Sequence, residues 1–116
     1  MTKVKKIETK IPEIRFRNEI LRLQLKTGEF VKLEDALGMS IWAMIQKFQN
    51  TKSGLGFREL TNIIYCASRK NHPDITMQNI YEIIEDSELP EVVEACINIF
   101  LQGLRTMKII PAEAKK

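Results

Sequence analysis

Two patterns of hydrophobic and polar positions follow one another along the chain. Over residues 13–26, apolar and polar residues alternate in two adjacent runs, EIRFR and ILRLQLK. The apolar positions are Ile14 and Phe16 in the first run and Leu21, Leu23 and Leu25 in the second. A period of two predicts two strands, and Asn18-Glu19 between them suits a tight turn. Because a lone hairpin is barely stable in water, we expect its apolar face to pack on helices.

After residue 26 the apolar spacing becomes helical. It predicts helices over about residues 28–37, 41–50, 57–68 and 77–86, and a fifth that follows Ser87 and weakens at Gly103. The expected caps are Thr27, Ser40, Thr76 and Ser87, with Gly38 ending the first helix and Pro90 in the first turn of the last. The expected core stripes are Phe30, Leu33 and Leu37; Ile41, Met44, Ile45 and Phe48; Leu60, Ile63, Ile64 and Ala67; Met77, Ile80, Tyr81 and Ile84; and Val93, Cys96, Ile97, Phe100, Leu101 and Leu104.

These elements predict a mainly α (α+β) fold, in which an N-terminal β-hairpin packs on a compact bundle of four to five short helices. A chain of 116 residues suits one domain with a real core. We expect this domain to span residues 13–110, after a flexible basic arm (1–12) and before a polar tail (111–116). No apolar run approaches the roughly 20 residues that cross a bilayer. The basic N-terminus does not resemble a secretory signal, so we expect a cytoplasmic protein.

Charge is unevenly distributed along the chain. The net charge is +3, yet residues 1–26 hold eight Lys or Arg against three Glu, and residues 71–104 hold seven Asp or Glu and no Lys or Arg. This asymmetry could steer a partner or let copies of the chain meet head to tail. It also fits two solvated faces of opposite sign.

The sequence offers little for catalysis, and we expect neither a cofactor nor a metal. The single histidine, His72, lies in the loop RKNHPD, where we expect it to be solvated. Cys66 and Cys96 fall within apolar helical patterns, so we expect buried, reduced thiols. The adjacent acids Glu34 and Asp35 would point about 100° apart on a helix. They cannot share a proton, and we expect both to face water.

A DNA-binding helix-turn-helix is one alternative. Its recognition helix would need basic side chains aimed outward. The third predicted helix offers only Arg58 and then Arg69-Lys70, and the following helices carry acids that phosphates would repel. The arm has no aromatic residue on which bases could stack. Nucleic-acid binding is therefore less favoured than protein binding.

Several large apolar residues fall outside the predicted core stripes. Exposed apolar side chains and methionines often mark binding surfaces. The candidate partner contacts are Met39, Trp42, Leu55, Met107, Ile109 and Ile110.

The order of the motifs is itself informative. LRLQLKTGEFVKLEDALGMSI (21–41) combines a strand, a polar turn, a short helix ending in LExxLG, and a capped helix. FRELTNIIYCASRK, HPDITMQNIYEIIED and VVEACINIFLQGL follow. Over about residues 14–105 the chain thereby resembles the tail assembly chaperones of long-tailed (siphovirus-type) phages and prophages of Gram-positive bacteria. The ending MKIIPAEAKK and the basic arm depart from the family pattern.

The resemblance implies a binding protein without enzymatic activity in the cytoplasm of a bacterial host. Such chaperones coat the tape measure protein in many copies until the tail tube assembles. The implied partners are the tape measure protein, the tail tube protein and further copies of the chain. Two alternatives stay open: a small helix-turn-helix DNA-binding regulator, and an adaptor subunit of another helical assembly.

Overall fold

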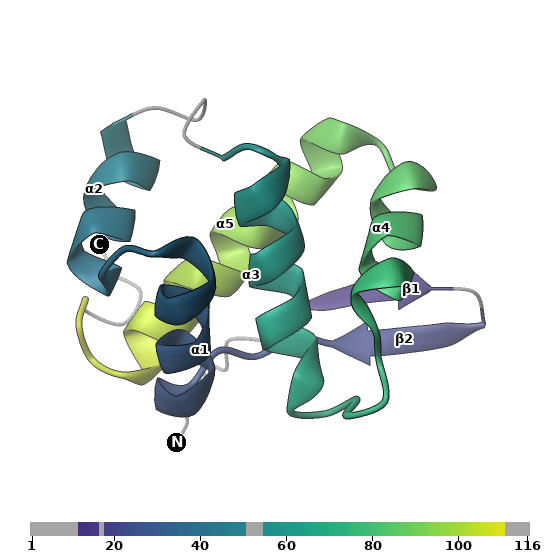
Figure 1. Ribbon diagram of the computed structural model, residues 1–116, viewed down its shortest axis with the longest axis horizontal. Coiled ribbons are helices and arrows are strands. Elements are labelled where there is room, and N and C mark those ends of the chain that lie inside the picture. Colours follow the sequence, from purple (N-terminus) through teal and green to yellow (C-terminus); the bar gives the residue numbers. More distant parts are fainter. Residues whose placement is uncertain (1–11, 17, 51–54, 111–116) are drawn as a thin grey trace, which may run out of the picture.

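The computed structural model describes residues 12–16, 18–50 and 55–110 (Figure 1). Within these residues an antiparallel hairpin precedes a set of helices. The elements are β1 (Glu13–Phe16), β2 (Glu19–Arg22), α1 (Thr27–Leu37), α2 (Ile41–Asn50), α3 (Phe57–Arg69), α4 (Met77–Glu85) and α5 (Leu89–Thr106). The predicted fold class is confirmed. The predictions for residues 1–11 of the arm, for Arg17 and for the tail from residue 111 lie outside the described residues.

The hairpin is shorter than the alternating pattern predicts. β1 pairs with β2 so that Ile14 lies opposite Leu21 and Phe16 opposite Glu19. Beyond Arg22 the N–H of Leu23 still donates to the carbonyl of Pro12 at 3.0 Å, but the N–H of Gln24 donates to the carbonyl of Ala67 at 2.9 Å, so the hairpin pairing ends there. The apolar face predicted for the second alternating run nevertheless points into the core. Its leucines, Leu21, Leu23 and Leu25, are all buried.

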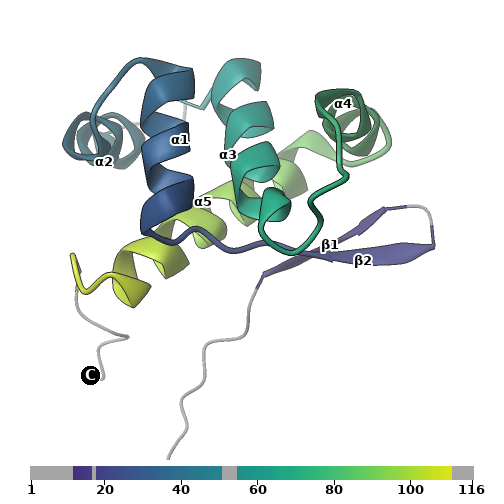
Figure 2. The ribbon, with the colours of Figure 1, turned by 60° about the horizontal axis from the view of Figure 1, so that its bottom comes forward.

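Helix α3 is the centre of the molecule. It packs against α1, α4, α5 and β2. Figure 2 shows α1 and α3 side by side with α5 running beneath them, while α2 lies at one end and α4 and the hairpin at the other. The predicted stripe of α3 is fully buried: Leu60, Ile63, Ile64 and Ala67. Burial of each large side chain among these contributes about 1.5–3 kcal/mol.

The short helix α1 ends as predicted and begins differently. Gly38 takes a left-handed conformation (φ 68°), and its N–H donates to the carbonyl of Glu34 at 2.8 Å. The predicted N-cap at Thr27 is wrong, because Thr27 is already helical and Lys26 precedes the helix. The carboxylate of Glu29 instead accepts the N–H of Lys26 at 3.0 Å.

The joint between α1 and α2 depends on an acid that was expected to face water. Glu34 is half-buried, and its Oε2 accepts the N–H of Ile41, the first residue of α2, at 2.8 Å. Ser40 caps the same helix as predicted, since its Oγ accepts the N–H of Ala43 at 3.1 Å. Asp35 is exposed, as expected. The expectation for Glu34 is therefore wrong: its carboxylate satisfies an N–H that the first turn of a helix leaves without a partner.

Helix α4 presents a different edge to the core than predicted. Its buried residues are Ile80 and Ile83, while Tyr81 is 46% exposed. Apolar residues occupy two neighbouring stripes of this short helix, and the tyrosine hydroxyl favours the stripe that reaches water. Thr76 caps α4 as predicted, with its Oγ1 accepting the N–H of Asn79 at 3.1 Å.

Helix α5 buries a face that is shifted from the predicted one toward Val92, Ile99 and Gly103. Its buried residues are Val92, Cys96, Ile99, Phe100, Gly103 and Leu104. Val93, Ile97 and Leu101 are only half-buried. Ser87 does not cap α5: its hydroxyl donates to the carbonyl of Ile83 at 2.6 Å, and Glu88 is the N-cap. Pro90 lies in the first turn, as predicted.

Gly103 has a packing role in α5. A Cβ at this position would lie 2.7 Å from the ring of Phe30 and 2.9 Å from the carbonyl oxygen of Leu25. The helix is thus close enough to α1 and the end of the leucine run that no larger residue fits without a shift. The sequence predicts only that this glycine weakens the end of the helix. In the structure, Gly103 also allows α5 to lie close to Phe30 and Leu25.

The Glu34–Ile41 hydrogen bond leads to a stability prediction with a neighbouring control. Glu34→Ala should lower the free energy of unfolding by about 1 kcal/mol, the usual cost of losing a side-chain cap. Asp35→Ala, on the exposed side of the same turn, should change it by less than about 0.5 kcal/mol. Urea denaturation of both variants measures the difference. Equal effects would mean that the carboxylate of Glu34 does not hold the joint.

Candidate partner-binding groove

An apolar groove lies between α2, α3 and α5. Its volume is about 250 Å³. The lining residues are Ile45, Phe48 and Gln49 of α2, Leu55 and Ile63, then Cys96, Ile97, Phe100, Leu101 and Leu104 of α5, and Ile110. Ile45, Phe48, Ile97 and Leu101 are half-buried, so the rim of the groove reaches the surface. Sequence periodicity assigns these four residues to the core and gives no sign that they border a groove.

The floor of the groove is aromatic and apolar. Phe100 lies edge-on to Phe48, with ring centroids 5.1 Å apart, and edge-on to Phe30 at 5.7 Å. Cys96 is buried, and burial raises the pKa of its thiol to about 12. The thiol therefore stays protonated at neutral pH. The described lining can bind apolar side chains, and none of its residues carries a charge.

An ion pair fixes one wall of the groove. Nζ of Lys47 on α2 lies 3.2 Å from Oε2 of Glu59 in the first turn of α3. The other oxygen of Glu59 accepts the N–H of Gly56 at 2.9 Å. Burial raises the pKa of the Glu59 carboxyl, but hydrogen bonds from its own backbone N–H, Lys47 and Gly56 outweigh this and lower the pKa below its ordinary value. The ionised carboxylate thus ties α2 to the start of α3.

The six residues predicted to contact a partner do not form one surface. Leu55 and Ile110 line the groove, and Leu55 is buried. Trp42 is 63% exposed and lies one turn before Ile45 on α2, so it adjoins the rim. The other three, Met39, Met107 and Ile109, are partly buried against the core.

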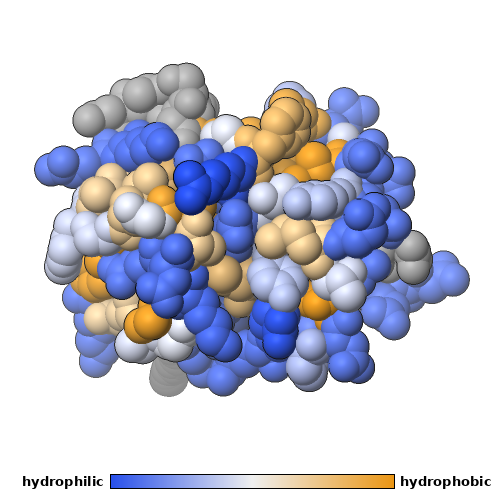
Figure 3. Space-filling model, in the orientation of Figure 1, coloured by the Kyte–Doolittle hydropathy of each residue, from blue (hydrophilic) through white to orange (hydrophobic). Residues whose placement is uncertain are grey.

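The face of the molecule in Figure 3 is mostly hydrophilic, and its apolar patches are separate from one another. Besides Trp42, the large apolar residues exposed in the described part of the chain are Ile20, Val31, Phe57, Tyr81 and Leu89. They come from different elements. Scattered single apolar residues of this kind are ordinary on a protein surface.

His72 has a structural position that differs from the solvated one expected. It is half-buried, and its Nε2 accepts the N–H of Arg22 at 3.0 Å. The side chain of Asn71 donates to the carbonyl of Arg22 at 3.3 Å. The loop after α3 therefore holds the outer edge of β2.

Of the remaining ionisable groups, Glu19, His72 and Asp74 line one hollow of about 590 Å³, and the two thiols are buried. Cys66 is a buried free thiol like Cys96, as predicted, and burial raises its pKa to about 11. Among the described residues, no three His, Cys, Asp or Glu side chains are placed to hold a metal ion.

Two of the basic residues considered for DNA binding already contact the chain itself. Arg58 donates to the carbonyl of Ala36 at 3.0 Å. The guanidinium of Arg69 donates to the hydroxyl of Tyr65 and lies 5.4 Å from the centre of its ring. These contacts reduce the number of free cations that α3 could present to phosphates.

Helices in the described part of the chain are all too short or too polar to cross a membrane. Comparisons with protein-family models, curated proteins and solved structures give no match.

The ionised Glu59 predicts a pH dependence of stability. Because the pKa of Glu59 is lower in the folded state, the unfolded chain takes up the proton first as pH falls below about 4.5. Its contribution to stability is complete above that pH and is lost as pH falls through the lower folded pKa. Glu59→Gln keeps an acceptor for the N–H of Gly56 but removes the charge that pairs with Lys47. It should therefore cost no more than about 1 kcal/mol at pH 7 and flatten this loss, as measured by urea denaturation at a series of pH values. A variant with the same pH slope as the wild type would contradict the assignment.

Proposed function

We propose that this protein is a phage tail assembly chaperone that binds the tape measure protein and keeps it soluble until the tail tube assembles. The proposal starts from the order of motifs over about residues 14–105, which resembles that family. It is supported on the structural side by the apolar groove between α2, α3 and α5. That groove is the single observation that carries the proposal.

The motif LEDALG connects the resemblance to the groove. Leu33 and Leu37 are buried, Gly38 ends α1, and Glu34 bonds to the first N–H of α2. The motif therefore sets the angle at which α2 leaves α1. Since α2 supplies Ile45 and Phe48 to the groove, the same residues that carry the resemblance position one groove wall.

The groove suits the apolar face of an amphipathic helix. Such helices bind by inserting side chains one turn apart into an apolar groove. A cavity of about 250 Å³ admits apolar side chains but does not enclose a whole helix. Binding of this kind is modest in strength, and a chaperone that tube subunits displace must release its client. Many copies, each holding one short helical stretch, would cover a long helical protein.

The DNA-binding alternative has weaker support. A recognition helix needs several outward cations, and Arg58 and Arg69 bond within the chain. On α2, Lys47 is paired with Glu59. An adaptor in another helical assembly would use the same groove, and the identity of the captured client distinguishes it from the proposed chaperone.

The test of the proposal uses an exposed aromatic residue beside the groove. Trp42→Ala should change the free energy of unfolding by less than about 0.5 kcal/mol, because the indole is mostly exposed. It should weaken binding of co-expressed tape measure protein by about 2 kcal/mol, the cost of truncating an aromatic hot spot. Affinity capture and the mass of the soluble complex measure the effect.

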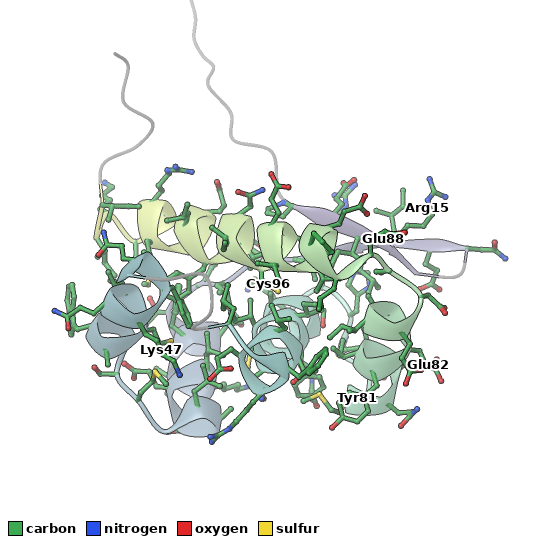
Figure 4. All side chains as sticks on the ribbon, turned by 90° about the horizontal axis from the view of Figure 1, so that it is seen from above. Arg15, Lys47, Tyr81, Glu82, Glu88 and Cys96 are labelled. Carbon is green, nitrogen blue, oxygen red and sulfur yellow. The ribbon has the colours of Figure 1, made fainter. Side chains whose placement is uncertain are left out.

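Tyr81→Ala is the matched control. Tyr81 is also an exposed aromatic residue, but it lies on α4, in a different part of the molecule from Lys47 and α2 (Figure 4). This variant should capture the tape measure protein as the wild type does. Precipitation of the tape measure protein with the wild-type chain present would overturn the proposed function. A salt-dependent affinity for DNA would then favour the regulator.

A further inference from the structure

The outer edge of β1 has backbone groups that the rest of the described chain does not satisfy. In an antiparallel pair, alternate residues point their N–H and C=O groups toward the partner strand and away from it. The N–H of Leu23 donates to the carbonyl of Pro12 at 3.0 Å, so Pro12 points toward β2. Glu13 and Arg15 must then point their backbone groups outward.

The other edge of the hairpin supports this assignment. Arg22 lies opposite Glu13, and its outward N–H and C=O bond to His72 and Asn71. The loop after α3 thus covers the β2 edge. No described residue bonds to the outward groups of Glu13 or Arg15. A strand edge in this state is a template for another strand.

Space is available beside this edge. A hollow of about 290 Å³ lies between β1 and the start of α5, where Ser87, Glu91 and Ala95 face the strand across it. Figure 4 shows Arg15 and Glu88 at this end of the molecule, where the hairpin meets the start of α5. The small side chains of Ser87 and Ala95 leave room along the strand.

We infer that β1 pairs with β1 of a second copy across a two-fold axis at Ile14, which joins two hairpins into one four-stranded antiparallel sheet. In this register Glu13 of each copy lies directly opposite the Arg15 of the other. Both residues point their backbone groups outward, so each such pair exchanges two N–H···O bonds. Their exposed side chains lie on one face of the sheet, close enough for opposite charges to attract.

Charge selects this register from its neighbours. Only residues whose backbone groups point outward can bond across the new edge. The register can therefore shift only by two residues, so that odd-numbered residues stay opposite odd-numbered residues. A shift in one direction places Glu13 opposite Glu13 of the second copy. A shift in the other direction places Arg15 opposite Arg15 of the second copy. Like charges directly opposite one another destabilise a sheet. On the inner face, the half-buried Ile14 meets the Ile14 of the second copy.

The contact is isologous, because the same patch serves on both copies, and it closes as a dimer. It covers only a few residues of one strand, so the dimer should be weak, reversible and sensitive to salt. It uses a surface at the other end of the molecule from Lys47 and α2, and it does not depend on the proposed function (Figure 4).

The charges allow a reciprocal test by sedimentation velocity over a range of concentrations. The wild-type chain should form a concentration-dependent dimer. Glu13→Arg places arginines at both outward positions, and Arg15→Glu places glutamates at both. Each variant alone should dimerise at least about tenfold more weakly, whereas an equimolar mixture of the two should form a heterodimer near wild-type strength.

Two further variants keep the test independent of folding. Glu19→Arg makes the same charge change on β2 and should leave the dimer unchanged. Arg15→Pro removes an outward N–H without removing a β1–β2 hydrogen bond, so it should weaken the dimer. A wild-type chain that stays monomeric at high concentration, or a mixture of the two charge variants that fails to associate, would overturn the inference.

Discussion

Burial of α3 is the constraint on which the rest of the structure depends. This helix contacts α1, α4, α5 and β2, and its residues Leu60, Ile63, Ile64 and Ala67 are almost fully inaccessible. Contacts from the end of the hairpin and from α2 converge on it. The carbonyl of Ala67 receives the chain as it leaves the hairpin, and Glu59 in the first turn holds α2 through Lys47. The groove lies where Phe48 of α2, Ile63 of α3 and Phe100 of α5 come together.

Polar contacts at the joint between α1 and α2 set how these two helices meet. Only three residues separate α1 from α2. Gly38 ends α1, while Glu34 and Ser40 accept N–H groups in the first turn of α2. This joint explains why a small protein contains such a short, sharply ended helix. Two acids of α1, Glu29 and Glu34, accept backbone N–H groups at the starts of α1 and α2. The function that we propose depends on the position of α2, which this joint sets.

The spacing of apolar residues predicted most of the fold, whereas two of the four predicted N-caps, Thr27 and Ser87, are wrong. For the run of Leu21, Leu23 and Leu25 and for α3, the spacing of apolar residues indicates a single buried face. Both predictions are confirmed. On α4 two apolar stripes lie side by side, so sequence could not choose Ile83 over Tyr81. The bonds of Glu34 to Ile41 and His72 to Arg22 join residues by tertiary proximity, which no local pattern encodes. For the same reason, residues of the groove rim looked like ordinary core positions.

The central claim is that the groove between α2, α3 and α5 binds a helical client. Hydrogen exchange of the chain, free and in complex with the tape measure protein, tests it most directly. The account predicts slower exchange in α2 and in the second half of α5 on binding, with little change in α4. Protection confined to α4 and the hairpin, or no complex at all, would contradict it.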